Sequence, residues 1–456
     1  MIEQKGVKIL TDGFDPCRRC VNKHINGFFS QQQFLVTMSP SIAKRRSAIE
    51  RYLERRQFYP FGVAAEVSSE LGLVVVIPCF DEPDIDTVLA SLADCEAPGC
   101  DVEVLVVVNA PAGAGAGILA RNAAATGRVR DLAAGVRPGW MRIHAIEHNT
   151  LPAAQAGVGL ARKLGMDEAA ARIATTHDSA GIIACLDVDC RVAPNYLVQL
   201  HAAFARHPGC LGMSIYFEHP GLFATDDPVH RAMIDYELHL RYYVAGQRMA
   251  GFPYAFHTVG SALVCSAAAY VAQGGMNLRQ GGEDFYFAQK LIAAGEYHEL
   301  NDTTVYPGVR LSARVPFGTG PAIRRALNSG EALETFAPQT FRDLEIFCAT
   351  LAEAVPGTAT DFVAGLPPAL REFLDSQGFA QRLEEIGANV ASDTSYRRRI
   401  LRWFNAFRFL KYAQYAGRGA YPKVPVTIAA HELAGPGVPR AAADLLRWYR
   451  RRDRDR

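Results

Sequence analysis

Two carboxylates directly follow an apolar run near the middle of the chain. Residues 182–186 carry only apolar side chains, and Asp187 and Asp189 come next with Val188 between them. Two acids so close together repel each other unless a divalent cation lies between them and another anionic group. In α/β sheets, ligands bind at the carboxyl ends of the strands. We therefore interpret Asp187 and Asp189 as ligands of Mg²⁺ or Mn²⁺ that bridge to a phosphate, which indicates a nucleotide-activated substrate.

A second acidic pair, Glu283 and Asp284, follows Gly281 and Gly282 at the expected start of a helix. A carboxylate in this place suits a general base that takes the proton of an attacking hydroxyl. The two glycines would let the backbone approach a substrate closely. The alternative is that both acids only complement the positive end of the helix dipole.

Two more segments carry side chains suited to a nucleotide. After an expected strand that ends at Pro78, Asp81 and Glu82 would hydrogen-bond ribose hydroxyls or a base edge, or else complement a helix N-terminus. Arg314 stands beside a turn rich in glycine and proline, residues 315–320. It would neutralise a diphosphate through bidentate contacts, or it belongs to an interdomain hinge with the arginine on the surface.

The strands and helices expected around these residues indicate how the fold would position them. Short β-branched runs predict strands at 73–77, 102–108, 141–146 and 181–186, and the segments between them predict helices at 84–92, 118–125 and 153–164. Continuous apolar strands that alternate with helices indicate a parallel sheet covered on both faces. The carboxyl ends of such strands would gather the polar residues that follow them at one edge.

Beyond Asp189 the sequence becomes mostly helical. We expect a strand at 261–265 and helices at 196–205, 230–243, 283–295, 342–352, 368–386 and 396–415. The expected fold class is therefore α/β, with a largely α-helical C-terminal region. The expected domains are a partly helical N-terminal extension at 1–70, a nucleotide-binding domain at 71–320 and the helical region at 321–456.

Three segments in order, 77–82, 186–189 and 282–284, resemble the motifs of family-2 glycosyltransferases of the GT-A fold. The resemblance covers residues 71–320 and implies a nucleotide-binding domain with a mostly parallel central sheet. It also implies metal-dependent, inverting transfer of a sugar from a nucleoside-diphosphate donor to an acceptor hydroxyl. The Gln-x-x-Arg-Trp segment of processive relatives does not occur in this sequence, so we expect single additions to an acceptor that the sequence does not identify.

The resemblance assigns roles by position. Asp189 would be the main ligand of Mn²⁺ or Mg²⁺, while Asp187 would lie near the donor sugar or bind the metal through water. Asp284 would be the catalytic base, and Glu283 would help to place the acceptor. Many relatives have an acidic residue where this second strand ends in Asn109, although an amide can still pair with a base edge. The residues expected to bind the donor nucleotide are Pro78, Phe80, Asp81, Glu82, Asn109, Asp187 and Arg314.

Composition narrows the class of protein. The chain has 456 residues and a formal net charge of +1, which gives no reason to expect nucleic acid as a partner. It has no apolar run of about 18 residues and no signal-peptide core, and its ten cysteines fit a reducing cytoplasm. Segment 397–411 is rich in basic and aromatic residues. It predicts either a helix peripheral to the inner face of a membrane or a helix packed on the protein with exposed arginines.

Two other functions remain open from the sequence. A sugar nucleotidyltransferase also combines a nucleotide-binding sheet with metal-binding acids, but it usually carries a basic, glycine-rich loop after the first strand, where this chain has Asp81 and Glu82. A non-catalytic nucleotide-sugar-binding protein would not need both acidic pairs. Release of pyrophosphate would indicate the first alternative, and the absence of turnover would indicate the second.

Overall fold

The computed structural model describes residues 40–135, 138–176, 181–279, 281–309, 319–329, 331–357 and 359–456. Within these ranges the chain forms a mixed sheet of eight strands in the order β3-β2-β1-β4-β7-β6-β8-β5. The strands are β1 (Leu71–Cys79), β2 (Asp101–Pro111), β3 (Met141–Leu151), β4 (Ile182–Cys185), β5 (Arg191–Val192), β6 (Gly212–Phe217), β7 (Leu263–Ser266) and β8 (Tyr297–Tyr306).

The sheet has a parallel half and a mixed half. β1 pairs in parallel with β2 and β4, and β2 pairs in parallel with β3, as the apolar runs predict. β7 then runs antiparallel to both β4 and β6. β6 is parallel to β8, and β5 is antiparallel to β8. The carboxyl ends of β1, β2 and β4 therefore lie at the same edge of the sheet.

Helices cover both faces of the sheet. Alternate residues of β1 point to opposite faces, so Leu73 and Val75 belong to one hydrophobic core while Val74 and Val76 belong to the other. The first core is completed by α3 (Asp86–Ala93), α4 (Ala116–Ala134) and α6 (Tyr196–Arg206). The second is completed by α2 (Pro40–Arg56), α5 (Val158–Ile173), α8 (Ala267–Ala272) and α9 (Glu283–Ala294). The α/β class expected from the sequence is confirmed.

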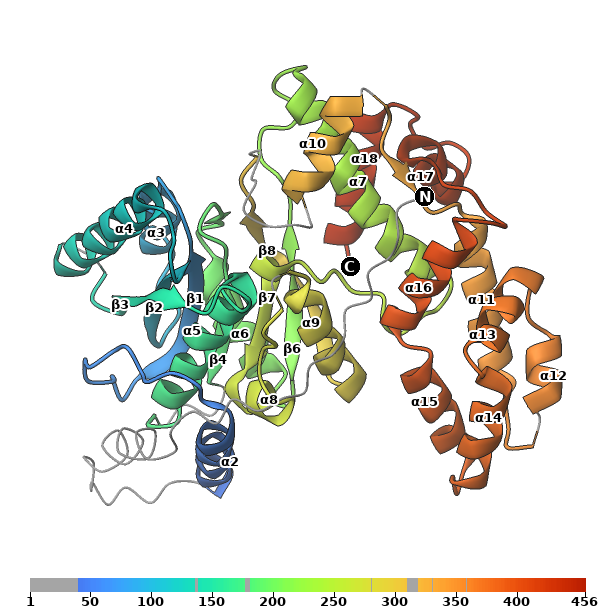
Figure 1. The fold of residues 1–456 in the computed structure, drawn as a ribbon, viewed down its shortest axis with the longest axis horizontal. Coiled ribbons are helices and arrows are strands. Elements are labelled where there is room, and N and C mark those ends of the chain that lie inside the picture. Colours follow the sequence, from blue (N-terminus) through green and yellow to red (C-terminus); the bar gives the residue numbers. More distant parts are fainter. Residues whose placement is uncertain are drawn as a thin grey trace.

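The C-terminal region is almost entirely helical, as expected. In Figure 1, helices α11 to α16 lie together at the side of the molecule farthest from β1, β2 and β3. The long helix α7 (Pro228–Met249) lies between and packs against α10, α11, α17 and α18. The helices are α10 (Thr319–Ser329), α11 (Gln339–Glu353), α12 (Ala359–Ala364), α13 (Pro368–Ser376), α14 (Phe379–Ala388), α15 (Asp393–Trp403), α16 (Ala406–Ala416), α17 (Val426–Ala434) and α18 (Ala442–Arg454). The short strands β9 (Glu334–Thr335) and β10 (Val424–Pro425) pair antiparallel, and a 3₁₀ turn, η1, spans Gly260–Ala262.

Several expected elements have different bounds in the structure. The helix expected at 153–164 begins only after Gly157, because residues 152–156 form a turn. The helix expected at 368–386 is broken at Gly378, whose φ of 67° lies outside the helical region. The one expected at 396–415 is broken before Asn405, whose side chain accepts from Arg408 N–H at 3.1 Å and so starts a new helix.

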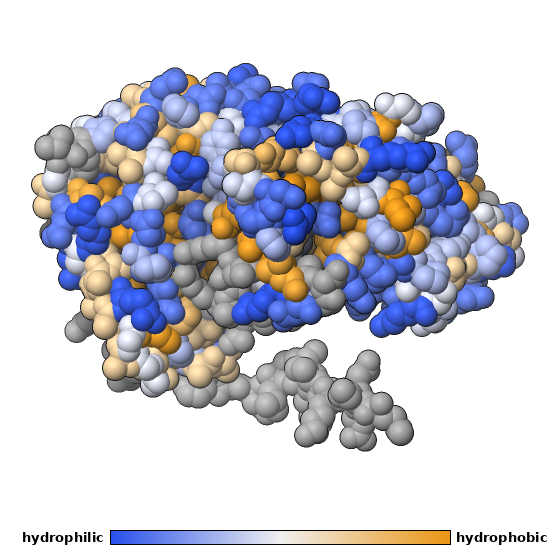
Figure 2. Space-filling model, turned by 90° about the horizontal axis from the view of Figure 1, so that it is seen from above, coloured by the Kyte–Doolittle hydropathy of each residue, from blue (hydrophilic) through white to orange (hydrophobic). Residues whose placement is uncertain are grey.

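Segment 397–411 packs against the protein. Ile400, Phe404 and Phe409 are fully buried in the helical core, and the guanidinium of Arg408 lies 3.6 Å from the ring centre of Trp403. This favours the packed helix over the membrane helix. On the face drawn in Figure 2, hydrophobic residues form small groups among hydrophilic ones. No helix in the described ranges has both the length and the hydrophobicity to cross a bilayer.

Candidate active site

A cavity of about 700 Å³ opens at the carboxyl ends of β1, β2 and β4. Seven residues singled out in the sequence line it: Pro78, Phe80, Asn109, Asp187, Asp189, Glu283 and Asp284. They come from three strand ends and from the start of α9. The fold therefore brings acids that are almost one hundred residues apart in the sequence into one cavity.

The end of β4 presents its two acids to this cavity. Leu186 N–H still donates to Val76 O, which continues the pairing with β1, and Cys190 N–H donates back to Asp187 O and closes a turn. Val188 is buried between the two acids, so Asp187 and Asp189 both stay partly exposed. Val188 and Asp189 are the central residues of this turn, and Val188 packs into the core.

Gly308 allows the backbone to pass close to Asp189. A Cβ added at Gly308 would lie 2.8 Å from the carbonyl oxygen of Asp189 and 3.2 Å from its Cβ. Any larger residue would therefore push the Asp189 segment away from its position. Gly308 also lines the cavity, so this close contact forms part of the site wall.

Arg162, which was not predicted from the sequence, links the two acidic pairs. From α5, its guanidinium lies 2.5 Å from Asp187 Oδ1 and also donates to Glu283 Oε1. Burial alone would lower the pKa of Arg162, but the carboxylates of Asp187, Glu283 and Asp284 raise it well above its usual value. Arg162 is therefore a fixed positive charge in the cavity wall. Gly260 makes room for it, because an added Cβ there would lie 2.5 Å from Arg162 Nη2.

The two acids of α9 differ in environment. Glu283 is only 1% exposed and is bound to Arg162. Asp284 is partly exposed, lines the cavity and accepts Phe285 N–H at 2.7 Å. Burial raises the pKa of Asp284, and the nearby Arg162 offsets this only in part. A carboxylate with raised proton affinity that faces a cavity can accept a proton from a bound hydroxyl.

The residues expected to contact the nucleotide separate into two groups. Pro78, Phe80 and Asn109 line the cavity. Asp81 does not: its carboxylate lies 2.5 Å from Arg121, and its backbone has a φ of 53°. The acid that follows it, Glu82, is 3% exposed, accepts from Asp84 N–H at 3.2 Å and is also absent from the lining. Arg314 lies outside the described residues.

A second part of the cavity lining was not predicted from the sequence. It comes from the end of β6, from α7, from the loop before η1 and from α16, and is mainly aromatic and apolar. Its members include Phe217, His219, Tyr236, Leu240, Tyr243, Tyr254, Phe256, His257, Ala406 and Leu410. The site thus has one acidic wall and one aromatic wall that carries two histidines.

The residues present suit a small divalent cation that is bound mainly by the phosphate groups of a substrate. Among the residues that the structure describes, no group of three or more histidines, cysteines or acids could enclose a metal ion. Asp187 and Asp189 still provide carboxylate oxygens on one segment. Mg²⁺ commonly binds through one or two carboxylates together with substrate phosphates, so this donor set suits a cation that arrives with a phosphorylated substrate.

Comparison with known proteins gives structural matches only. No family model and no curated sequence matches the chain. The structure of residues 1–349 of S. aureus TarS in complex with UDP-GlcNAc has a TM-score of 0.39 and 13% identity, covering 71% of this chain and 89% of that one. The mannosyltransferase PcManGT from Pyrobaculum calidifontis in complex with GDP-Man and Mn²⁺ has a TM-score of 0.33 and 15% identity, covering 88% of this chain and 99% of that one. With similarity at this level, function has to be inferred from the site itself.

Proposed function

We propose that the protein is a metal-dependent glycosyltransferase that moves one sugar from a nucleoside-diphosphate donor to an acceptor hydroxyl, with inversion. The observation that carries the proposal is the shared cavity, which Asp187 and Asp189 enter from β4 and Asp284 enters from α9. One pair of acids suits a cation on a diphosphate, and the other carboxylate suits the activation of a hydroxyl.

The donor side is assigned to the strand ends. Asp189 and Asp187 would hold Mn²⁺ or Mg²⁺, which would supply positive charge to the diphosphate as it leaves. Pro78, Phe80 and Asn109 line the part of the cavity proposed for the nucleoside. Asp81 and Glu82 do not line this cavity, so the resemblance alone assigns them to the donor nucleotide. Arg314 is assigned to the diphosphate from its residue chemistry.

The acceptor side is assigned to α9. The carboxylate of Asp284 would take the proton of the acceptor hydroxyl while that oxygen attacks the anomeric carbon and the bond to the diphosphate breaks. Arg162 supports this role indirectly, because it compensates Asp187 and Glu283 and fixes where both carboxylates lie. We assign Glu283 to the placement of the acceptor.

The test is a product assay with purified protein. We expect release of nucleoside diphosphate from a panel of UDP- and GDP-sugars in the presence of Mn²⁺, and loss of that release when the cation is removed with EDTA. Pyrophosphate as the product would support a nucleotidyltransferase instead. Tight nucleotide-sugar binding without any turnover across the panel and a range of acceptors would support a non-catalytic binding protein. The anomeric configuration of the product, read by NMR, tests inversion.

A further inference from the structure

Two histidines in the aromatic wall each lie within hydrogen-bonding distance of a carboxylate. His219 Nδ1 lies 3.0 Å from Glu237 Oε2, and His257 Nε2 lies 3.3 Å from Asp453 Oδ2. The side chain of His219 is 4% exposed and that of His257 is 10% exposed. Both histidines line the cavity, and both rings contact Phe217 edge to face.

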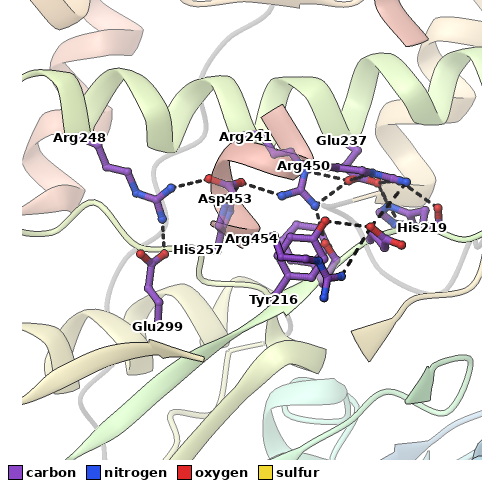
Figure 3. Close-up of polar contacts among 12 residues, drawn as sticks. Tyr216, His219, Glu237, Arg241, Arg248, His257, Glu299, Arg450, Asp453 and Arg454 are labelled. Atoms are coloured by element: carbon purple, nitrogen blue, oxygen red, sulfur yellow. Dashed lines mark hydrogen bonds and ion pairs between the residues drawn. The ribbon is translucent and has the colours of Figure 1, made fainter. Parts of the chain in front are cut away.

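The carboxylates belong to a buried network of charges between α7 and α18 (Figure 3). Arg241 lies 2.8 Å from Glu237 and 2.7 Å from Asp453. Arg450 lies 2.6 Å from Glu237. Burial alone would raise the pKa of both acids. Arg241, His219 and Arg450 instead hold the pKa of Glu237 well below its usual range, and His257, Arg241 and Arg248 do the same for Asp453. Glu237 and Asp453 are therefore ionised and can only accept hydrogen bonds.

An ionised acceptor determines which ring nitrogen carries the proton. Nδ1 of His219 and Nε2 of His257 must be N–H groups, because each faces a carboxylate. The other nitrogen accepts a hydrogen bond in a neutral ring and donates one in a charged ring, and a sugar hydroxyl can pair with either. Nε2 of His219 and Nδ1 of His257 have no hydrogen-bond partner in the described part of the chain. Two ring nitrogens in the cavity wall are therefore available to a ligand.

The surroundings of these nitrogens indicate what kind of ligand would bind. Aromatic rings from Tyr236, Tyr254 and Phe256 line the same wall. Two other buried polar atoms in cavity-lining residues, Tyr243 Oη and Gln289 Oε1, have no hydrogen-bond partner among the described residues. A sugar ring offers hydroxyl donors around its edge and C–H groups on its faces, whereas an aliphatic alcohol offers one hydroxyl and no such ring.

We propose that His219 and His257 bind hydroxyl groups of a saccharide acceptor through Nε2 and Nδ1, and that Glu237 and Asp453 orient them for this purpose. The inference rests on the proposed function and names its acceptor class. Asp453 lies on the last helix of the chain, so α18 would be needed to form the acceptor site as well as to stabilise the fold.

One substitution in each histidine keeps a donor in place of the nitrogen that faces the carboxylate and removes the other nitrogen. In His219→Asn the amide nitrogen takes the place of Nδ1 and can still donate to Glu237, while Nε2 is lost. In His257→Gln the amide nitrogen takes the place of Nε2 and can still donate to Asp453, while Nδ1 is lost. His207→Asn is the matched control, because His207 stacks on His298 outside this cavity. Thermal unfolding shows which variants keep the fold.

Two binding measurements read the donor and acceptor sides separately. Calorimetry with UDP and GDP in the presence of Mg²⁺ reports the donor side, and saturation-transfer NMR with a panel of methyl glycosides reports the acceptor side. We expect both cavity variants to bind the nucleoside diphosphate within about twofold of the wild type, and to bind methyl glycosides at least tenfold more weakly. The His207→Asn control should resemble the wild type in both measurements.

Other outcomes decide against one proposal or the other. Methyl glycosides that bind both cavity variants as well as the wild type would overturn the inference, and so would a wild type that binds aliphatic alcohols but no glycoside. If glycosides bind through the histidines while no nucleoside diphosphate binds, the acceptor site stands and the glycosyltransferase proposal fails.

Discussion

The guanidinium of Arg162 lies 2.5 Å from the carboxylate of Asp187 at the end of β4, and the same group donates to Glu283 at the start of α9. One buried cation thus connects the acids proposed for the donor to those proposed for the acceptor. α5, β4 and α9 all contribute residues to the same core, which sets the spacing of the elements that carry the two acidic pairs.

Arg162→Met should destabilise the fold strongly. Removing one partner of a buried ion pair leaves the other charge uncompensated, which typically costs about 3–5 kcal/mol. Here the uncompensated group is Glu283, which is 1% exposed. Urea unfolding at pH 7 measures the change. Arg128→Met is the control, because Arg128 and its partner Asp86 are both exposed, and it should leave the urea midpoint unchanged. Equal midpoints for Arg162→Met and wild type would show that Arg162 does not compensate a buried charge.

Asp284→Asn should lose transfer but keep donor binding. A missing general base typically lowers the rate by about 10²–10⁴-fold. Because the pKa of Asp284 is raised, wild-type kcat/KM should fall as the pH decreases through a value above the usual aspartate pKa of about 3.9. That acidic limb should be absent from the residual activity of the variant. Wild-type turnover by Asp284→Asn would exclude it as the base, and Asp86→Asn serves as an exposed control.

The same substitution should stabilise the fold at neutral pH. A carboxyl group whose folded pKa is raised above its unfolded value costs stability when it is ionised, and the cost disappears as the pH falls below the unfolded pKa. Asp284→Asn removes the ionised form, so its free energy of unfolding should exceed that of the wild type at pH 7. The two proteins should converge near pH 3. A less stable variant at pH 7 would contradict the raised pKa.

Asp189→Ala should remove the metal-dependent part of nucleotide binding. We expect calorimetry with UDP and GDP to show tighter binding with Mn²⁺ than without it for the wild type, and no such difference for the variant. Asp302→Ala, at an exposed acid paired with Arg206 at 3.5 Å, should retain the Mn²⁺ effect. A full Mn²⁺ effect in Asp189→Ala would assign the cation to other residues.

The parallel half of the fold could be predicted because its signal is local. β1, β2 and β4 are apolar runs, so each is recognisable alone, and the acids that follow them must lie at one sheet edge. β8 (Tyr297–Tyr306) could not be predicted in this way, because polar and charged residues interrupt it. It owes its strand conformation to pairing with β6 and β5.

The site residues that directly follow a strand could be predicted from the sequence. Those whose position depends on partners far away in the chain could not. Arg162 stands in a helix whose residues are nearly all buried, next to Lys163 and before Asp167, Glu168 and Arg172, so its charge alone did not distinguish it. His257 depends on Asp453, 196 residues away, which no local pattern reveals. Asp81 is turned towards Arg121 by a positive φ that the sequence does not specify.

Asp453→Ala should destabilise the protein far more than Asp455→Ala, although the two residues are neighbours on the chain. Asp453 is 7% exposed and lies 2.7 Å from Arg241 and 2.6 Å from Arg248, while Asp455 is exposed. Without Asp453, Arg241 is paired only with Glu237 and Arg248 only with Glu299. Breaking a buried ion pair typically costs about 3–5 kcal/mol. Because the folded pKa of Asp453 is lowered, this contribution should be complete above the unfolded pKa of about 3.9 and decline as the pH falls further. Urea unfolding from pH 7 to pH 2 measures it, and a difference that persists unchanged at pH 2 would mean that Asp453 stabilises the fold through packing rather than charge.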